Sequence, residues 1–250
     1  MRELDRPPLG GGENVNYFVE YEAQQALMRV SNGSEVNETL RHYYDYTGFT
    51  DRDKGILRKR TPFEQYEFSR KAAESGLAVL PPLAIVGNKV LYPFLEQTQT
   101  LMEYLSNGDE GHTAILPAIF YDMREAHRLG FIYGDRNAEN ILVGVGTSHY
   151  FTHIDFDLSI SGKTAREFEV AELSMHALNY AGGNSLPILA SALGTMCAQT
   201  PRWIDLDRTA SYMRRMGEML YTDLGADISI LANQELLAKS TKAIRDMNRG

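Results

Sequence analysis

The side chains best suited to chemistry lie in one stretch near the middle of the chain. Asp135 precedes Asn140 by five residues, and Asp155 follows Asp135 by twenty. An apolar, β-prone segment, 141–143, directly follows Asn140, and a second, 150–154, leads into Asp155, with glycines marking a turn between them. If these segments pair as a hairpin, Asn140 and Asp155 lie at its open end, and Asp135 lies on the loop that leads into it.

Oxygen ligands in this arrangement suit a hard divalent cation bound to phosphate. Asn140 and Asp155 offer the oxygens that Mg²⁺ prefers, with Mn²⁺ as a substitute, and Asp157 is a further candidate ligand. Such a metal spans nucleotide phosphate oxygens and neutralises the charge that develops on them. Asp135 would accept the proton of an attacking hydroxyl. The cluster therefore predicts phosphoryl transfer from ATP, with Asp135, Asn140 and Asp155 as the catalytic residues.

These motifs resemble the catalytic segments of the protein-kinase-like superfamily. The run from Asp135 to Asn140 matches the D-x-x-x-x-N of the catalytic loop, and Asp155-Phe156-Asp157 stands at the DFG position. The resemblance covers most of the chain and is concentrated between residues 116 and 172. It implies an ATP-dependent kinase with a bilobal α+β fold, in which a small β-rich lobe covers a helical lobe.

Departures from the protein-kinase pattern indicate a subclass. Tyr133-Gly134-Asp135 replaces His-Arg-Asp and so lacks the arginine that grips a phosphorylated activation loop. A glycine before this aspartate is similar to aminoglycoside phosphotransferases, and the Ile-Asp-Phe-Asp run ending at Asp157 is similar to lipopolysaccharide-core kinases. By the same resemblance, Glu169 would brace the catalytic loop. Asn137 stands where protein kinases place a lysine near the γ-phosphate, which puts that contact in doubt.

The amino-terminal half carries weaker signals for nucleotide binding. Gly10, Gly11 and Gly12 could form the turn that covers the phosphates, or a flexible tail before the first strand. Arg29 is the only basic residue of the strand 25–30, where kinases carry a lysine, and it could equally be a solvated strand residue. If the segment after this strand folds back, Lys54, Lys59 and Arg60 are alternatives to Arg29.

Two further features complete the expected nucleotide site. Glu64 or Glu67 would pair with the basic residue, although Glu64 could serve only as a capping-box residue. The run that contains Phe94, Leu95 and Glu96 resembles the kinase hinge, whose backbone groups meet adenine. The resemblance therefore implies cofactor-binding residues at Gly10–Gly12, Arg29, Glu64 and Phe94–Glu96.

The elements needed to position these residues are visible in the pattern of the sequence. Strands are expected at 16–21, 25–30, 77–85 and 89–95, helices at 62–74, 98–105 and 113–129, and helical periodicity from 164 onward. Residues 32–53 resemble an insertion or a long loop. We expect one catalytic unit with a nucleotide-covering lobe, 1–96, a lobe with the catalytic loop and metal site, 97–250, and a cleft between them.

Composition excludes several classes of protein. The chain has 250 residues, 25 Lys and Arg and 33 Asp and Glu, and the resulting net charge of −8 disfavours nucleic acid as a partner. The single cysteine, Cys197, excludes a disulfide framework and fits a reducing compartment. No secretory signal and no membrane span are recognisable. We expect a cytoplasmic protein, although a secreted effector without a cleavable signal would look the same.

The acceptor of the phosphoryl group is left open between several readings. A hydroxyl of a small molecule, sugar or glycan is favoured by Gly134 and by the short segment after Asp157. A compact atypical Ser/Thr protein kinase is the alternative, followed by a nucleotide-binding pseudokinase and a kinase-fold nucleotidyltransferase. A hydrolase metal site of His153, Asp155 and Asp157 is a further reading, which leaves Asp135 and Asn140 without a role. The oligomeric state and the pathway do not follow from the sequence.

Overall fold

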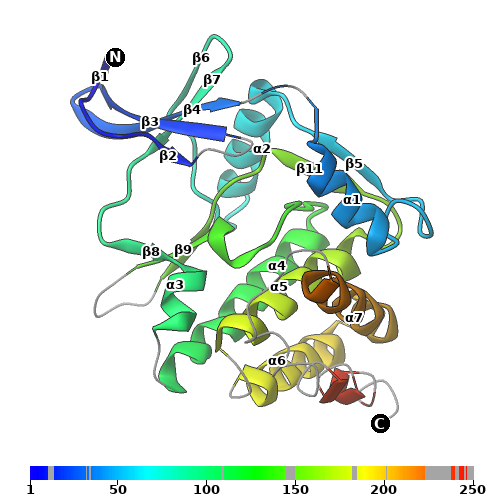
Figure 1. Ribbon diagram of the computed structural model, residues 1–250. Coiled ribbons are helices and arrows are strands. Elements are labelled where there is room, and N and C mark those ends of the chain that lie inside the picture. The colour runs from blue at the N-terminus through cyan, green and yellow to red at the C-terminus, as the bar shows by residue number, and fades with distance from the viewer. Residues whose placement is uncertain are drawn as a thin grey trace.

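The computed structural model describes residues 1–10, 14–31, 33, 35–107, 110–144, 150–181, 185–200, 202–222, 238–239, 242–244 and 246. Its architecture is α+β: a β-sheet with one helix occupies the amino-terminal part, and most of the remaining helices form the carboxyl-terminal part (Figure 1). The expected α+β arrangement of a β-rich part and a helical part is confirmed.

An antiparallel sheet forms the amino-terminal part. Its strands are β1 (Arg2–Glu3), β2 (Leu9–Gly10), β3 (Asn14–Tyr21), β4 (Gln24–Ser31), β6 (Ala84–Val86) and β7 (Lys89–Pro93). The order is β1-β3-β4-β7-β6, and β2 pairs with β3. β3 and β4 alternate partly exposed and buried residues, which lets one face pack inward on Val19, Ala26, Met28 and Leu91.

The helix α2 (Pro62–Glu74) has the bounds that the sequence predicts. Thr61 accepts the backbone N–H of Glu64, and the Glu64 carboxylate returns to the backbone N–H of Thr61, so both halves of a capping box are present. The strand expected at 77–85 is wrong for most of its length, because only its last two residues belong to β6. Consecutive prolines at 81 and 82 lack the N–H groups that a ladder needs.

The segment between β4 and α2 leaves the sheet and packs against the helical part. It contains α1 (Glu38–Tyr46), begun by the N-cap Asn37, and β5 (Ile56–Lys59). α1 lies against α7 (Leu206–Thr222). β5 pairs antiparallel with β11 (Leu158–Ser161), the strand that directly follows Asp157. The described residues of the insertion expected at 32–53 thus include a helix, and α1 and β5 together form an arm whose strand β5 reaches the segment beside the predicted site.

Helices build the carboxyl-terminal part around one core (Figure 1). They are α3 (Leu101–Ser106), η1 (Glu110–Ile115), α4 (Leu116–Arg128), η2 (Ala138–Asn140), α5 (Ala165–Ala181), α6 (Ser185–Gln199) and α7, where η marks a 3₁₀ turn. α5 is buried along most of its length and packs against α3, α6 and α7. It is the central support of this part.

A small sheet lies between the sheet-rich part and these helices. β9 (Ile141–Gly144) and β10 (Phe151–His153) pair antiparallel, which forms the expected hairpin. β8 (Thr98–Thr100) pairs with the other edge of β9. The helix expected to begin at 98 therefore begins only at Leu101, because Thr100 takes the N-cap position and accepts the backbone N–H of Glu103.

Within the described ranges, no helix is both long enough and apolar enough to cross a bilayer. The predicted division of the chain at residues 96 and 97 stays a prediction. The arm of α1 and β5 lies on the amino-terminal side of that division in the sequence, yet it contacts elements from the other side.

Candidate active site

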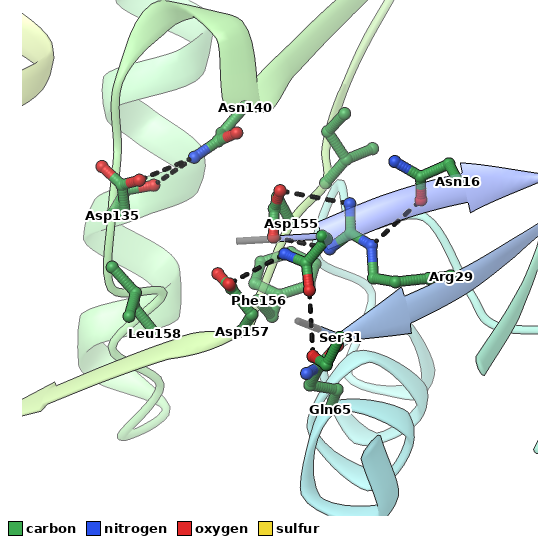
Figure 2. A network of polar contacts seen from close by, with 12 residues as sticks. Asn16, Arg29, Ser31, Gln65, Asp135, Asn140, Asp155, Phe156, Asp157 and Leu158 are labelled. Atoms are coloured by element: carbon green, nitrogen blue, oxygen red, sulfur yellow. Dashed lines mark hydrogen bonds and ion pairs between the residues drawn. The ribbon is translucent and has the colours of Figure 1, made fainter. Parts of the chain in front are cut away.

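Asp135, Asn140 and Asp155 lie together at the open end of the β9–β10 hairpin. Asn140 Nδ2 donates to the Asp135 carboxylate Oδ2 at 3.2 Å and to the Asp135 carbonyl at 3.0 Å. The backbone N–H of Ile154 donates to the Asn140 carbonyl at 3.0 Å, which sets Asp155 next to Asn140. Figure 2 shows Asp135 and Asn140 pointing toward each other, with Asp155 beside them. The structure thus brings the three predicted residues into one cluster.

Arg136 holds the backbone of this cluster in place through hydrogen bonds. Its side chain is fully buried, and its guanidinium donates to the carbonyls of Asn140 (3.3 Å), Ile154 (3.0 Å) and Asp155 (2.8 Å). The backbone N–H of Arg136 donates to Glu172 of α5 at 2.7 Å. One residue therefore ties the loop to the ends of both hairpin strands and to the central helix.

Asn137 is a site residue whose contact the sequence does not predict. Its Nδ2 lies 3.2 and 3.1 Å from the two carboxylate oxygens of Asp135, and its Oδ1 accepts the backbone N–H groups of Glu139 and Asn140 as the cap of η2. Asn137 thus orients the carboxylate of Asp135. The spacing of Asp135 and Asn137, two residues apart, could have indicated this contact, since short polar side chains commonly bond to neighbouring groups.

Arg29 reaches across from β4 to Asp155. Its Nη1 and Nη2 lie 2.5 and 3.1 Å from the two Asp155 oxygens, and its Nε donates to Asn16 on β3 at 3.2 Å (Figure 2). The Arg29 side chain is 9% exposed and that of Asp155 is 23% exposed. Arg29 therefore points into the site, and its reading as a solvated strand residue is wrong.

The expected partnership of Arg29 with Glu64 is also wrong. Glu64 lies at the start of α2, where it closes the capping box and pairs with Arg58 at 2.9 Å. Glu67 pairs with Arg70 and Lys71 of its own helix. These local partners are within one or two turns, and they satisfy both carboxylates without any contribution from β4. Asp155 takes the place expected for a helix carboxylate.

Asp157 is buried and faces the start of β3. Asn14 Nδ2 donates to its carboxylate at 2.8 Å, and Ser31 Oγ donates to Asn14 Oδ1 at 2.9 Å. Asp157 also shares a hydrogen bond with Asp155. Asp157, which the sequence predicts as a metal ligand, thus accepts a hydrogen bond from the first residue of β3, the strand that follows the glycine triplet. Gly10 ends β2, whereas Gly11 and Gly12 lie outside the described residues.

The acids of the cluster differ in their ionisation. Burial raises the pKa of Asp135 to about 6, helped by the negative charge of Asp155. Burial and the same neighbour raise the pKa of Asp157 to about 7. Burial is the largest single influence on Asp155 and opposes its ionisation, but the charges of Arg29 and Arg136 and hydrogen bonding together outweigh it and lower the pKa of Asp155. Asp155 is therefore the acid most readily ionised, and Asp135 and Asp157 hold their protons closer to neutral pH.

A pocket of about 530 Å³ opens beside this cluster. Phe94, Leu95 and Glu96, the residues predicted to form the hinge, line it, as do Arg29 and Asp155. Its apolar walls come from both parts of the chain: Leu27, Leu80, Tyr92, Leu142 and Ile154. An apolar pocket with a charged end suits a flat ring bearing a charged tail. Asp155, the member of the cluster that lines this pocket, therefore shares one cavity with the predicted hinge.

Gly134 allows the catalytic loop to pass close to the strand after Asp157. Its φ is +107°, and a Cβ at this position would lie 2.3 Å from the Leu158 carbonyl oxygen. A side chain here would force backbone apart, so the glycine that replaces the kinase arginine is required by the packing. The N–H of Gly134 donates to Glu169 of α5, which gives Glu169 the bracing contact that the resemblance implies.

On the other side of Glu169, the hydrogen-bonded chain continues through His127 to the buried Trp203. His127 Nε2 lies 2.7 Å from Glu169 Oε2, and Trp203 Nε1 donates to His127 Nδ1 at 3.0 Å. Because Nδ1 accepts this bond, the proton of a neutral His127 resides on Nε2 and is donated to Glu169. The loop before Asp135 is thus held by a continuous hydrogen-bonded chain that ends at Trp203.

Arg60 is the second site residue that the sequence did not place. Its guanidinium donates to the carbonyls of Ile132 and Tyr133, before Asp135, and to those of Phe156 and Leu158, after Asp155. The arm does fold back, as one interpretation of the sequence required, but Arg60 bonds to backbone in the loop rather than facing the pocket. It joins the two segments that carry the cluster.

Asn140 and Asp155 offer few ligands, which fits Mg²⁺ better than a metal ion held by protein side chains alone. Asn140 keeps its Oδ1 free of the bonds that its Nδ2 makes to Asp135, and Asp155 is ionised next to it. Among the described residues, no three His, Cys, Asp or Glu side chains are grouped to hold a metal. Mg²⁺ commonly takes one or two carboxylates and completes its shell with phosphates and water.

His153 lies away from this donor set. It is fully buried, its Nε2 is 3.3 Å from Asp122 Oδ2, and its ring lies 4.5 Å from that of Tyr133. Burial lowers the pKa of His153 and favours the neutral ring. The side chain is thus a core histidine with a carboxylate partner, and the hydrolase interpretation loses one of its three ligands.

Comparison with solved structures finds chains of similar fold, several of them kinases. No protein family matches the sequence, and no curated protein matches it either. The chain is similar in structure to WaaP, a lipopolysaccharide-core kinase solved in complex with acyl carrier protein (TM-score 0.50, 12% identity, 98% of this chain and 89% of that chain). It is also similar to the Rio2 kinase of Chaetomium thermophilum, solved with ADP/Mg²⁺ and phosphoaspartate (TM-score 0.48, 14% identity, 100% and 72%). A Plasmodium vivax ethanolamine kinase matches at a TM-score of 0.47 (9% identity, 96% and 80%).

The chain therefore has the protein-kinase-like fold, in a bilobal α+β form. The likeness to WaaP carries this conclusion, and at 12% identity it concerns the fold alone. The fold that this resemblance implies is confirmed.

Proposed function

We propose that this protein is an ATP-dependent phosphotransferase that moves the γ-phosphoryl group to a hydroxyl of a small molecule, sugar or glycan. The observation that carries the proposal is the convergence of Asp135, Asn140 and Asp155 in one cluster, of which Asp155 lines an apolar pocket that the predicted hinge also lines. Kinase-fold neighbours support the general class of reaction. ATP would place its base in the pocket and its phosphates toward Asp155.

Asp135 is the proposed acceptor of the proton. The acceptor hydroxyl oxygen bonds to the γ-phosphorus, the bond from that phosphorus to the β–γ bridging oxygen breaks, and ADP leaves. The hydroxyl proton passes to Asp135, whose pKa of about 6 suits a base that works near neutral pH. Asn137 and Asn140 orient its carboxylate through their Nδ2 groups.

Asn140 and Asp155 would hold Mg²⁺, with Asp157 nearby. When bound, this ion neutralises charge on the phosphate oxygens. Arg29 is the proposed basic group for the phosphates, because its guanidinium already lies at the Asp155 end of the pocket. A guanidinium can bind phosphate through two N–H groups at once, which a lysine cannot do.

The proposed class of acceptor rests on the segment after Asp157. Protein kinases bind peptide acceptors on a long activation segment, whereas seven residues, 158–164, link Asp157 to α5 here. Four of these form β11 and are paired to β5. A small acceptor needs no such platform. For the same reason, we place a Ser/Thr protein kinase second among the phosphotransferases.

A second function, nucleotide binding without turnover, is favoured by one contact. Arg29 engages both oxygens of Asp155, the carboxylate proposed to bind the metal. A protein that kept this ion pair in the presence of ATP would hold the nucleotide without the metal needed for transfer. The same pair in an active enzyme must open, or give up one oxygen, when nucleotide binds.

Transfer from labelled ATP distinguishes these functions. The protein is incubated with Mg²⁺, a panel of sugars, aminoglycosides and glycans, and ATP labelled at the γ or the α phosphate. We expect γ label in an acceptor, and its loss in Asp135→Asn and Asp155→Asn. Glu139→Gln is the matched control, because Glu139 is exposed in the same 3₁₀ turn as Asn140.

Each other outcome identifies a different function. Label arriving from the α position indicates nucleotidyl transfer and contradicts the proposal. ATP binding by the wild type without transfer to any acceptor or to the protein supports the second function. Equal γ transfer by the wild type and both aspartate variants would mean that the cluster is not the catalytic site.

A further inference from the structure

A basic hollow lies on the helical part, separate from the cleft. It consists of two adjoining depressions of about 320 and 490 Å³, which share Arg166, Arg202 and Trp203 as lining residues. None of the residues that line them also lines the pocket beside Asp155. The hollow is formed by the end of α4, the start of α5 and the connection between α6 and α7.

Cations in this hollow exceed the carboxylates that face them. Within the described ranges, Lys163, Arg166 and Arg202 have no Asp or Glu within ion-pair distance, whereas Arg124 and Arg128 share Glu125 at 3.0 and 2.7 Å. Glu167 also lines the larger depression, and its carboxylate accepts the backbone N–H of Asp205 at 3.1 Å. The excess of positive charge stands out in a chain whose net charge is −8.

Two further features favour an anion at this place. Arg124 lines the smaller depression with a side chain that is only 8% exposed; its Nη1 donates to Gln199 and its Nη2 to Glu125, while its buried Nε has no hydrogen-bond partner within the described part of the chain. The first residues of α5, a helix of 17 residues, line the larger depression. The amino-terminal end of a long helix carries positive partial charge and free N–H groups.

We propose that this hollow is a second binding site, for a small ligand that bears a phosphate group. Two guanidinium groups and one ammonium group without carboxylate partners match the charge and the acceptor oxygens of a phosphate, and guanidinium groups bind such oxygens in pairs. The concave shape and the volume suit a small molecule better than a flat protein surface. The site is independent of the proposed phosphotransfer activity.

Trp203 makes the proposal directly testable. It is the only tryptophan of the chain, it lines both depressions, and its Nε1 is held by His127. Its fluorescence therefore reports on this hollow. Inorganic phosphate is titrated into the full-length protein at constant ionic strength, with chloride as the balancing anion. We expect a saturable change of Trp203 fluorescence with phosphate and none with chloride.

Charge-removing variants assign the response to the hollow. Arg202→Gln and Lys163→Gln change exposed residues, and each loses a charge-assisted hydrogen bond to the ligand, so we expect the apparent affinity to fall about tenfold or more. Arg214→Gln is the matched control, since Arg214 is exposed on α7 and pairs with Glu218. Melting temperatures equal to the wild type show that the variants are folded.

Several results would overturn the proposal. These are a linear response, a response that chloride reproduces, or equal phosphate affinity in Arg202→Gln and the wild type. A saturable response to poly-glutamate with none to phosphate would overturn it in favour of an acidic protein partner. None of these results bears on transfer from ATP, because the hollow and the cleft share no lining residue.

Discussion

Replacing Arg60 with methionine tests how the two halves of the candidate site are joined. The Arg60 guanidinium donates to four backbone carbonyls, two before Asp135 and two after Asp155, and it lies 4.1 Å from the ring centroid of Phe68. Burial lowers the pKa of Arg60 to about 10, so the group remains charged at neutral pH. Methionine keeps much of the apolar stem and removes every donor.

The size of the effect follows from these contacts. A hydrogen bond from a charged donor contributes about 1.5–3 kcal/mol, so four acceptors set an upper range of roughly 6–12 kcal/mol. The cost of burying a charge, several kcal/mol, is recovered in the variant and offsets about half of this. We expect Arg60→Met to lower the free energy of unfolding by about 3–6 kcal/mol. For a chain of this size, this is a fall in Tm of roughly 6–24 °C.

Thermal unfolding followed by circular dichroism measures this loss, with Arg58→Met as the matched control. Arg58 lies on β5, two residues before Arg60; its side chain is 51% exposed, and it pairs with the partly exposed Glu64. Its loss should cost at most about 1 kcal/mol. If Arg60→Met and Arg58→Met lower the Tm equally, or if Arg60→Met costs less than about 1 kcal/mol, Arg60 does not hold the two segments together.

Two further predictions concern ionisation and close packing. Because the pKa of Asp157 is raised to about 7, the folded chain keeps a proton that the unfolded chain releases from about pH 4 upward, so this group lowers stability as the pH rises toward 7. Asp157→Asn should flatten that part of the profile in urea unfolding at pH 5 and pH 8; parallel profiles would contradict the shift. Gly134→Ala should lower the free energy of unfolding by about 2–4 kcal/mol. The added Cβ would collide with the Leu158 carbonyl, and alanine is also strained at the positive φ of this position. Gly76→Ala, at φ +82° with open space around it, carries the backbone strain alone, and an equal fall in Tm for both would disprove the clash.

The cluster of Asp135, Asn140 and Asp155 could be predicted because its geometry is local. Asp135 and Asn140 are five residues apart on a loop and a 3₁₀ turn, and a short hairpin brings Asp155 back beside Asn140. Similarly, the capping box of Thr61 and Glu64 involves only four consecutive residues. In each case the contact follows from short-range geometry, so residue types and spacing are sufficient.

The contacts that complete the site depend on long-range topology. Arg29 meets Asp155 across 126 residues of sequence, and the acceptors of Arg60 lie 72 to 98 residues away. The periodicity of apolar residues in the sequence does not reveal contacts between residues so far apart in the chain. The pairing of Arg29 with Glu64 was wrong because Arg58, six residues from Glu64, competes for the same carboxylate and lies closer. Local competition decides between candidate partners that the sequence alone cannot rank.

The short segment after Asp157 is held in place without a regulatory loop. In protein kinases, the arginine before the catalytic aspartate grips a phosphorylated activation segment. Here Gly134 takes that position, and its lack of a side chain lets the Leu158 carbonyl approach the loop directly. Arg60 bonds to this same carbonyl, and β5 pairs with the strand that begins there. Arg60 thus binds the segment after Asp157, the segment that an arginine at position 134 would bind in a protein kinase. Because β5 pairs with β11, and Arg60, the residue after β5, bonds to the Leu158 carbonyl, the arm of α1 and β5 positions this segment.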